Sequence, residues 1–191
     1  MKKFDFTKQL PTHLSDRYEK EYFLIFSIIV AGRNAKMATE KTWELLKWIR
    51  NEDTPFSYLK QVITDGFLLA SLQKAKVGQY KRICKAIEDV VNLDVETCSL
   101  PDLEECQGIG PKTSRFFLMH CRKDFKCAVL DTHILKWLND RIGWYLDIPN
   151  STPKGKKYLE LEKHCIRLIG KNFPELSLAQ ADFEIWKQYA N

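Results

Sequence analysis

Residues 108–113 read Gly-Ile-Gly-Pro-Lys-Thr and lie between two stretches of helical pattern. Glycine adopts positive φ angles at no steric cost and has no Cβ, so two glycines around one apolar residue allow a tight reversal that a ligand can approach closely. Pro111 suits the first turn of a new helix, where its missing N–H is not needed. The sequence therefore predicts a helix, a glycine hairpin and a second helix.

The two helices around this hairpin have recognisable start signals. Ser99 is a good N-cap, and Pro101 and Asp102 suit the first helical turn that follows it. This helix ends at the two glycines. The second helix is expected from 111 to about 122. Its apolar faces come from Phe116, Phe117 and Met119.

The backbone N–H groups of such a hairpin lie near a helix N-terminus, which is a favourable position for an anion. We expect a phosphate oxygen to bind there. The candidate backbone-binding residues are Gly108, Ile109, Gly110 and Thr113. The alternative is a plain helix C-cap and turn, which is how most Gly-x-Gly pairs are used.

Asp131 follows Lys112 by 19 residues, and the chain between them is long enough to bring the two together. A helix from 111 to about 122 is ~18 Å long at ~1.5 Å per residue. The stretch 123–130 spans up to ~26 Å when extended, so it can return to the start of that helix. Asp131 is also a natural N-cap for a helix over 132–141, which would fix its position.

Lys112 and Asp131 are candidate catalytic residues for cleavage of a glycosidic bond. A carboxylate beside a lysine in a dry pocket can take a proton from the amine and can stabilise a cationic sugar. The amine can attack a sugar C1′ and form a Schiff base, which allows β-elimination of the 3′ phosphate. The alternative is that Lys112 is an ordinary phosphate contact and Asp131 is only a helix cap.

Residues 108–113, together with Val-Leu-Asp-Thr-His-Ile at 129–134, resemble the helix-hairpin-helix, Gly/Pro-Asp superfamily of DNA glycosylases. In the bifunctional members the lysine is the Schiff-base nucleophile and the aspartate is the essential carboxylate. The resemblance implies these roles for Lys112 and Asp131. It also implies an all-α, two-lobed fold with the active site in the cleft between the lobes. The lobes would comprise about 34–130 and about 1–33 plus 131–191.

Other segments resemble one branch of this superfamily, the compact archaeal-type 8-oxoguanine DNA glycosylase/AP lyase. With them the resemblance extends from about 22 to 186. It implies that Trp186 lines a base pocket and that Asp182 belongs to the same pocket. The alternatives are a core tryptophan and a helix first-turn acid. The matching segments are 79–82, 148–149, 157–162, 168–170 and 177–186.

The loop at 31–35, Ala-Gly-Arg-Asn-Ala, also fits this branch. Either Arg33 or Asn34 would fill the hole that an extruded nucleotide leaves in the duplex, or both belong to a simple surface turn. The branch has a lysine after the pocket tryptophan that contacts oxidised guanine, and this sequence has no clear counterpart. The target base therefore stays open between an oxidised purine such as 8-oxoguanine and an oxidised or modified pyrimidine.

The composition fits a globular protein that binds DNA. The 191-residue chain is 45% hydrophobic and 29% charged, with a formal net charge of +5. Residues 108–145 contain seven Lys or Arg and three Asp, so most of the excess charge falls where the phosphate site is predicted. Neither a signal peptide nor a run of membrane length is apparent. We expect an intracellular, DNA-associated protein of the cytoplasm and nucleoid, or of a nucleus.

The cysteines predict neither a metal site nor a disulfide framework. Their gaps are wide and irregular, without a CxxC pair, which suits neither zinc nor an iron–sulfur cluster. We expect reduced thiols and an enzyme that needs no metal ion or organic cofactor. The six cysteines are residues 84, 98, 106, 121, 127 and 165.

The resemblance and the residues together predict a monomeric, bifunctional DNA glycosylase/AP lyase of base excision repair. Its partner would be double-stranded DNA with a damaged base or an abasic site. The main alternative is a non-enzymatic helix-hairpin-helix module that only holds DNA. A helical protein-interaction module is disfavoured, because it leaves the pairing of Lys112 with Asp131 unexplained.

Overall fold

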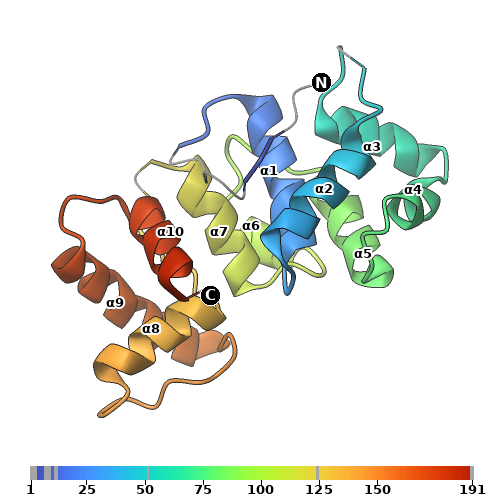
Figure 1. Ribbon diagram of the computed structural model, residues 1–191. Coiled ribbons are helices and arrows are strands. Elements are labelled where there is room, and N and C mark those ends of the chain that lie inside the picture. The colour runs from blue at the N-terminus through green and yellow to red at the C-terminus, as the bar shows by residue number, and fades with distance from the viewer. Residues whose placement is uncertain (1–3, 7–9, 11–12, 51, 124, 190–191) are drawn as a thin grey trace. The chain divides into compact units, whose positions relative to one another are not determined.

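The computed structural model describes residues 4–6, 10, 13–50, 52–123 and 125–189. These residues form ten α-helices and no β-strand (Figure 1), which confirms the predicted all-α fold. The chain divides into two compact units, Met1–Gly110 and Pro111–Asn191. This division differs from the predicted lobe boundaries, and those boundaries remain a prediction.

The first unit contains six helices, and local sequence signals explain where several of them begin. Asp16 caps the first helix by accepting a hydrogen bond from the N–H of Glu19. Thr54 and Ser99 each form a reciprocal capping box at helices that have proline in the first turn, and the cap at Ser99 is the one predicted above. The helices are α1 (Arg17–Val30), α2 (Ala35–Leu46), α3 (Pro55–Thr64), α4 (Leu68–Lys74), α5 (Tyr80–Val90) and α6 (Leu100–Glu105).

Helix α1 is the core helix of the first unit and packs against α2, α3 and α5. Residues 20–29 are all buried, which is typical of a helix with neighbours on every side. One of them is a carboxylate, Glu21, which accepts hydrogen bonds from Arg17 Nε at 3.0 Å and from the N–H of Phe56 at 2.9 Å. These partners satisfy a charge that would otherwise be costly to bury, and they tie α1 to the start of α3.

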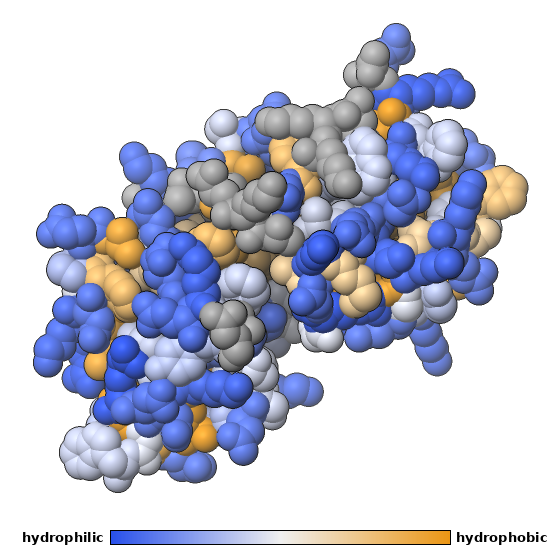
Figure 2. All heavy atoms as spheres, viewed as in Figure 1, coloured by the Kyte–Doolittle hydropathy of each residue, from blue (hydrophilic) through white to orange (hydrophobic). Residues whose placement is uncertain are grey.

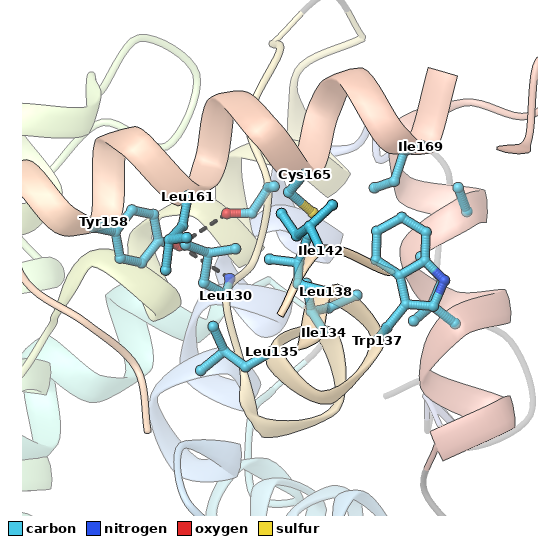
Figure 3. Close-up of a cluster of buried hydrophobic side chains, with 13 residues drawn as sticks. Leu130, Ile134, Leu135, Trp137, Leu138, Ile142, Tyr158, Leu161, Cys165 and Ile169 are labelled. Atoms are coloured by element: carbon cyan, nitrogen blue, oxygen red, sulfur yellow. Dashed lines mark hydrogen bonds between the residues drawn. The ribbon is translucent and has the colours of Figure 1, made fainter. Parts of the chain in front are cut away.

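The second unit contains four helices around its own core. Helix α10 packs against α7, α8 and α9. Side chains of α8, α9 and α10 form one buried cluster with Ala128 and Leu130 (Figure 3). The segment that leads into Asp131 is therefore part of this core. The helices are α7 (Pro111–Cys121), α8 (Thr132–Ile142), α9 (Gly155–Asn172) and α10 (Leu178–Tyr189).

Hydrophilic side chains cover most of the face shown in Figure 2, and the apolar patches between them are small and separate. Two tryptophans are among the large hydrophobic side chains left exposed: Trp48 in the first unit and Trp144 in the second. None of the described helices is both long and apolar enough to cross a membrane.

Candidate active site

The predicted hairpin is present between α6 and α7, and its first glycine is required by the backbone. Gly108 has a φ of +80°, a conformation that L side chains rarely adopt. A Cβ at this position would lie 2.8 Å from Cγ of Arg82 and 2.9 Å from its backbone oxygen. The hairpin therefore approaches α5 more closely than any residue other than glycine allows.

Arg82 braces this hairpin. Its guanidinium donates to the carbonyl oxygens of Gly108 at 3.0 Å and Ile28 at 2.8 Å, and to Oε1 of Gln79 at 2.7 Å. Burial, and secondarily the charge of Arg33, lowers the pKa of Arg82 below its ordinary value. The helical pattern of the sequence places Arg82 on the solvent side of α5, so this role was missed. A long side chain can reach past the edge of its helix to a neighbouring loop.

The remaining hairpin residues differ in how their groups are used. The Ile109 side chain is buried, and its N–H donates to the carbonyl oxygen of Cys106 at 3.2 Å. Ile109 thus anchors the hairpin, while Gly108 is exposed and Gly110 is half-buried. Thr113 is buried in the first turn of α7. Phosphate binding by these four residues remains a prediction.

Lys112 and Asp131 lie side by side in the second unit. Lys112 Nζ is 4.0 Å from Asp131 Oδ2, and their side chains are 31% and 17% exposed. Asp131 caps α8, because its Oδ1 accepts hydrogen bonds from the N–H groups of His133 and Ile134, both at 2.9 Å. One carboxylate oxygen therefore serves the helix and the other faces the amine. Both side chains keep enough exposure for a substrate to reach them.

Asp182, on α10, is a third ionisable group of this site. The residue is 7% exposed. Burial raises the pKa of Asp182 well above its ordinary value, the charge of Asp131 raises it further, and Lys112 opposes the shift. The protonated form of Asp182 is therefore favoured, and a protonated carboxyl can donate a hydrogen bond. Asp182 and Asp131 thus differ in environment although both are acids.

Trp186 lies one helical turn after Asp182 and is half-buried. Its ring stacks parallel to Phe183 at a centroid distance of 6.0 Å, and the ring of His133 meets it edge-to-face at 6.1 Å. His133 Nδ1 donates to the carbonyl oxygen of Tyr189 at 2.8 Å, which holds the end of α10 against the start of α8. The indole is thus fixed by its neighbours while part of it stays accessible.

No protein-family model and no curated protein matches this sequence. Among solved structures, the chain is similar to the Methanocaldococcus jannaschii 8-oxoguanine glycosylase/lyase, crystallised with a 15-mer DNA that contains 8-oxoguanine. The two are 21% identical over 98% of this chain and 86% of that one, with a TM-score of 0.63. The chain has the helix-hairpin-helix DNA glycosylase fold. This confirms the fold that the resemblance implied, and at this identity the likeness shows the fold alone.

Within this glycosylase fold, the loop before α2 holds the two residues predicted to enter the duplex. Asn34 caps α2, since its Oδ1 accepts hydrogen bonds from the N–H groups of Lys36 at 2.9 Å and Met37 at 3.3 Å. The Arg33 guanidinium lies beside Gly78, where an added Cβ would be 3.1 Å from it. Insertion of Arg33 or Asn34 into DNA remains a prediction.

All six cysteines of the chain are free thiols, and all except Cys84 are buried. Within the described parts of the chain, no group of three or more His, Cys, Asp or Glu could hold a metal ion. Lys112, Asp131 and Asp182 give the site an amine, a carboxylate and a buried carboxyl, all in the second unit.

Proposed function

We propose that this protein is a bifunctional DNA glycosylase/AP lyase, which removes a damaged base and then nicks the strand. The observation that carries the proposal is the 4.0 Å approach of Lys112 Nζ to Asp131 Oδ2 in a chain with the glycosylase fold. An amine and a carboxylate at this separation can exchange a proton and can act together on one bound sugar.

The reaction follows from these two groups. Asp131 accepts a proton from the Lys112 ammonium, and the free amine attacks C1′ of the sugar. The C1′–N bond breaks, and the base leaves with the bonding electrons and takes up the proton that Asp131 accepted. Asp131 is then a carboxylate again, and its negative charge stabilises the cationic sugar–lysine adduct. Opening of the sugar ring gives a protonated Schiff base on Lys112. Loss of a proton from C2′ then expels the 3′ phosphate by β-elimination.

The other predicted residues would position the DNA for this chemistry. The hairpin at 108–110, next to the N-terminus of α7, suits a phosphate oxygen. An extruded base would stack on the indole of Trp186 and receive a hydrogen bond from the protonated carboxyl of Asp182. Extrusion costs a few kcal/mol, roughly, and less at a damaged pair.

As substrate we propose an oxidised purine of the 8-oxoguanine class in duplex DNA. The structural neighbour, named as an 8-oxoguanine glycosylase/lyase, was crystallised with DNA containing that base, which supports this choice. A panel of duplexes, each with one oxidised purine, oxidised pyrimidine, deaminated base or modified pyrimidine, tests it. Fastest release of a pyrimidine would replace the proposed substrate and leave the reaction type intact.

Borohydride trapping on a duplex with an abasic site tests the enzyme itself, because only a Schiff base is reduced to a stable protein–DNA crosslink. Wild-type protein should form the crosslink, and Lys112→Gln should bind the same DNA without forming it. Lys126→Gln, which changes an exposed lysine of the same unit, is the matched control. Trapping that persists in Lys112→Gln would remove this lysine from its role. DNA binding without any trapping by the wild type would favour the non-enzymatic DNA-binding module.

We further propose that the protein acts as a monomer on duplex DNA and is associated with the genome in the cell. Sedimentation of the protein with one equivalent of an abasic duplex tests the first statement, since a monomer should form a one-to-one complex.

A further inference from the structure

A buried arginine lies one turn after Lys112 on α7. Arg115 is 4% exposed, and its Nε donates to Glu162 Oε1 on α9 at 2.8 Å. The guanidinium also lies over the ring of Tyr158, with its central carbon 4.4 Å from the ring centroid. A buried charge of this kind requires a partner, and α9 provides both an anion and an aromatic face. Helix α7 is therefore attached to α9 close to the candidate nucleophile.

The same two residues of α9 hold the segment that leads into Asp131. Glu162 Oε1 also accepts a hydrogen bond from the N–H of Ala128 at 3.1 Å. The Tyr158 hydroxyl donates to the carbonyl oxygen of Ala128 at 2.8 Å and accepts from the N–H of Leu130 at 3.2 Å (Figure 3). These bonds engage backbone groups of Ala128 and Leu130. Both belong to a buried, non-helical stretch, which otherwise lacks the hydrogen bonds of a helix or sheet.

These contacts join the two reacting groups by a short route through the protein. Lys112 lies three residues before Arg115, and Asp131 directly follows Leu130. Arg115 and Leu130 are both tied to one turn of α9, through Glu162 and Tyr158. The distance between the Lys112 amine and the Asp131 carboxylate therefore depends on how α9 packs against α7 and against residues 128–130. A small change in that separation matters, because proton transfer and attack both depend on geometry.

We propose that Arg115, Glu162 and Tyr158 are positioning residues, which set the distance between Lys112 and Asp131 without touching the DNA. This inference rests on the proposed glycosylase/lyase function. It predicts that weakening the network slows the chemical step and leaves DNA binding unchanged, because Arg115 and Tyr158 are buried within the second unit.

The test measures borohydride trapping of an abasic duplex under single-turnover conditions with saturating protein. Tyr158→Phe removes only the hydroxyl, and Glu162→Gln keeps an acceptor but removes the charge opposite Arg115. Each should lower the trapping rate constant between about 10-fold and about 100-fold. Affinity for an uncleavable abasic analogue, measured by fluorescence anisotropy, should stay within about twofold. The trapping rate constant and the affinity of each variant are measured on folded protein, well below its unfolding temperature.

Ile169→Ala is the matched control, because a merely structural network would act through stability. Ile169 is buried in the same cluster, toward the opposite end of α9 from Tyr158 (Figure 3). It should lower the unfolding temperature and leave the trapping rate unchanged. An unchanged rate in both network variants, with normal wild-type trapping, overturns this inference alone. An equal loss of rate in Ile169→Ala overturns it as well. If the wild type traps no DNA, the proposed function fails and the inference fails with it.

Discussion

The guanidinium of Arg82 donates a 3.0 Å hydrogen bond to the carbonyl oxygen of Gly108, and the backbone of the same arginine lies against the missing Cβ of that glycine. One residue of α5 thus holds the hairpin by a polar contact and also limits what the hairpin can contain. The N–H of Gln107 adds a second tie to α5 by donating to Asp89 Oδ2 at 2.7 Å. The orientation of the hairpin amides is therefore determined within the first unit.

Gly108→Ala should destabilise the protein and weaken DNA binding together. The new methyl group meets Arg82 at under 3 Å, and the φ of +80° is unfavourable for alanine. We expect a loss of roughly 1–3 kcal/mol in the free energy of unfolding, measured with urea. Gly110→Ala is the control for stability, because no atom lies within 4 Å of its added Cβ. Similar losses in the two variants would contradict the prediction.

Substitutions of Asp131 should separate its structural use from its chemical use. Asparagine is as good an N-cap as aspartate, so Asp131→Asn should change the free energy of unfolding by less than about 1 kcal/mol. Asp131→Ala loses the cap and should cost about 1 kcal/mol more. Both variants lack the carboxylate, so both should reduce trapping by at least about 100-fold. Full trapping activity in Asp131→Asn would show that the charge is not needed.

Asp182 should lower the stability of the protein as the pH rises. Because the pKa of Asp182 is raised, the folded protein keeps this proton at pH values where the unfolded chain has lost it. The free energy of unfolding therefore falls as pH rises above about 4 towards the raised folded pKa. Asp182→Asn removes this dependence, so the variant should gain stability relative to wild type with rising pH. Urea unfolding from roughly pH 5 to 8 measures it.

Asp147→Asn, an exposed aspartate of the same unit, is the control for that titration. A stability difference between Asp182→Asn and wild type that is the same at every pH would mean that Asp182 is not protonated in the folded protein.

Trp186→Ala should impair base release and spare the lyase step. Stacking of a base on an aromatic ring contributes about 1–3 kcal/mol, which corresponds to about 5-fold to about 150-fold in rate. An abasic site has no base to stack, so strand nicking at such a site should change little. Single-turnover assays on a lesion duplex and on an abasic duplex measure the two steps. Trp144→Ala, which removes an 84% exposed tryptophan, should change neither.

Features with a local cause were predictable from the sequence. Asp16, Thr54 and Ser99 each announce a helix start, and the helices begin directly after them. The return of Asp131 to Lys112 was also predictable, because it depends only on the length of the intervening helix and of the extended stretch that follows. The resulting 4.0 Å separation is a property of the structure, and the catalytic roles of both residues remain predictions.

Features that depend on packing between distant segments were not predictable. In the sequence, Arg82 is one of several basic residues on an amphipathic helix. Only the folded position of the hairpin brings the carbonyl oxygen of Gly108 within its reach. Arg115 and Glu162 are 47 residues apart, and no spacing rule relates charges on different helices. Asp182 carries no local sign that it is buried. The sequence left open an exposed acid in the first turn of a helix, but α10 begins at Leu178, which places Asp182 beyond the first turn and among the buried residues of that helix.

Because Asp131 caps α8, its carboxyl group is oriented as soon as the protein folds. Rotation of the carboxyl group about its last bond would break the two hydrogen bonds that Oδ1 accepts from the N–H groups at the start of α8. The direction of Oδ2 is thus settled when the chain folds, before any nucleic acid arrives. Little reorganisation of this group should accompany the reaction, and the carboxylate should have the same rotamer in the free protein and in its complex with a lesion duplex.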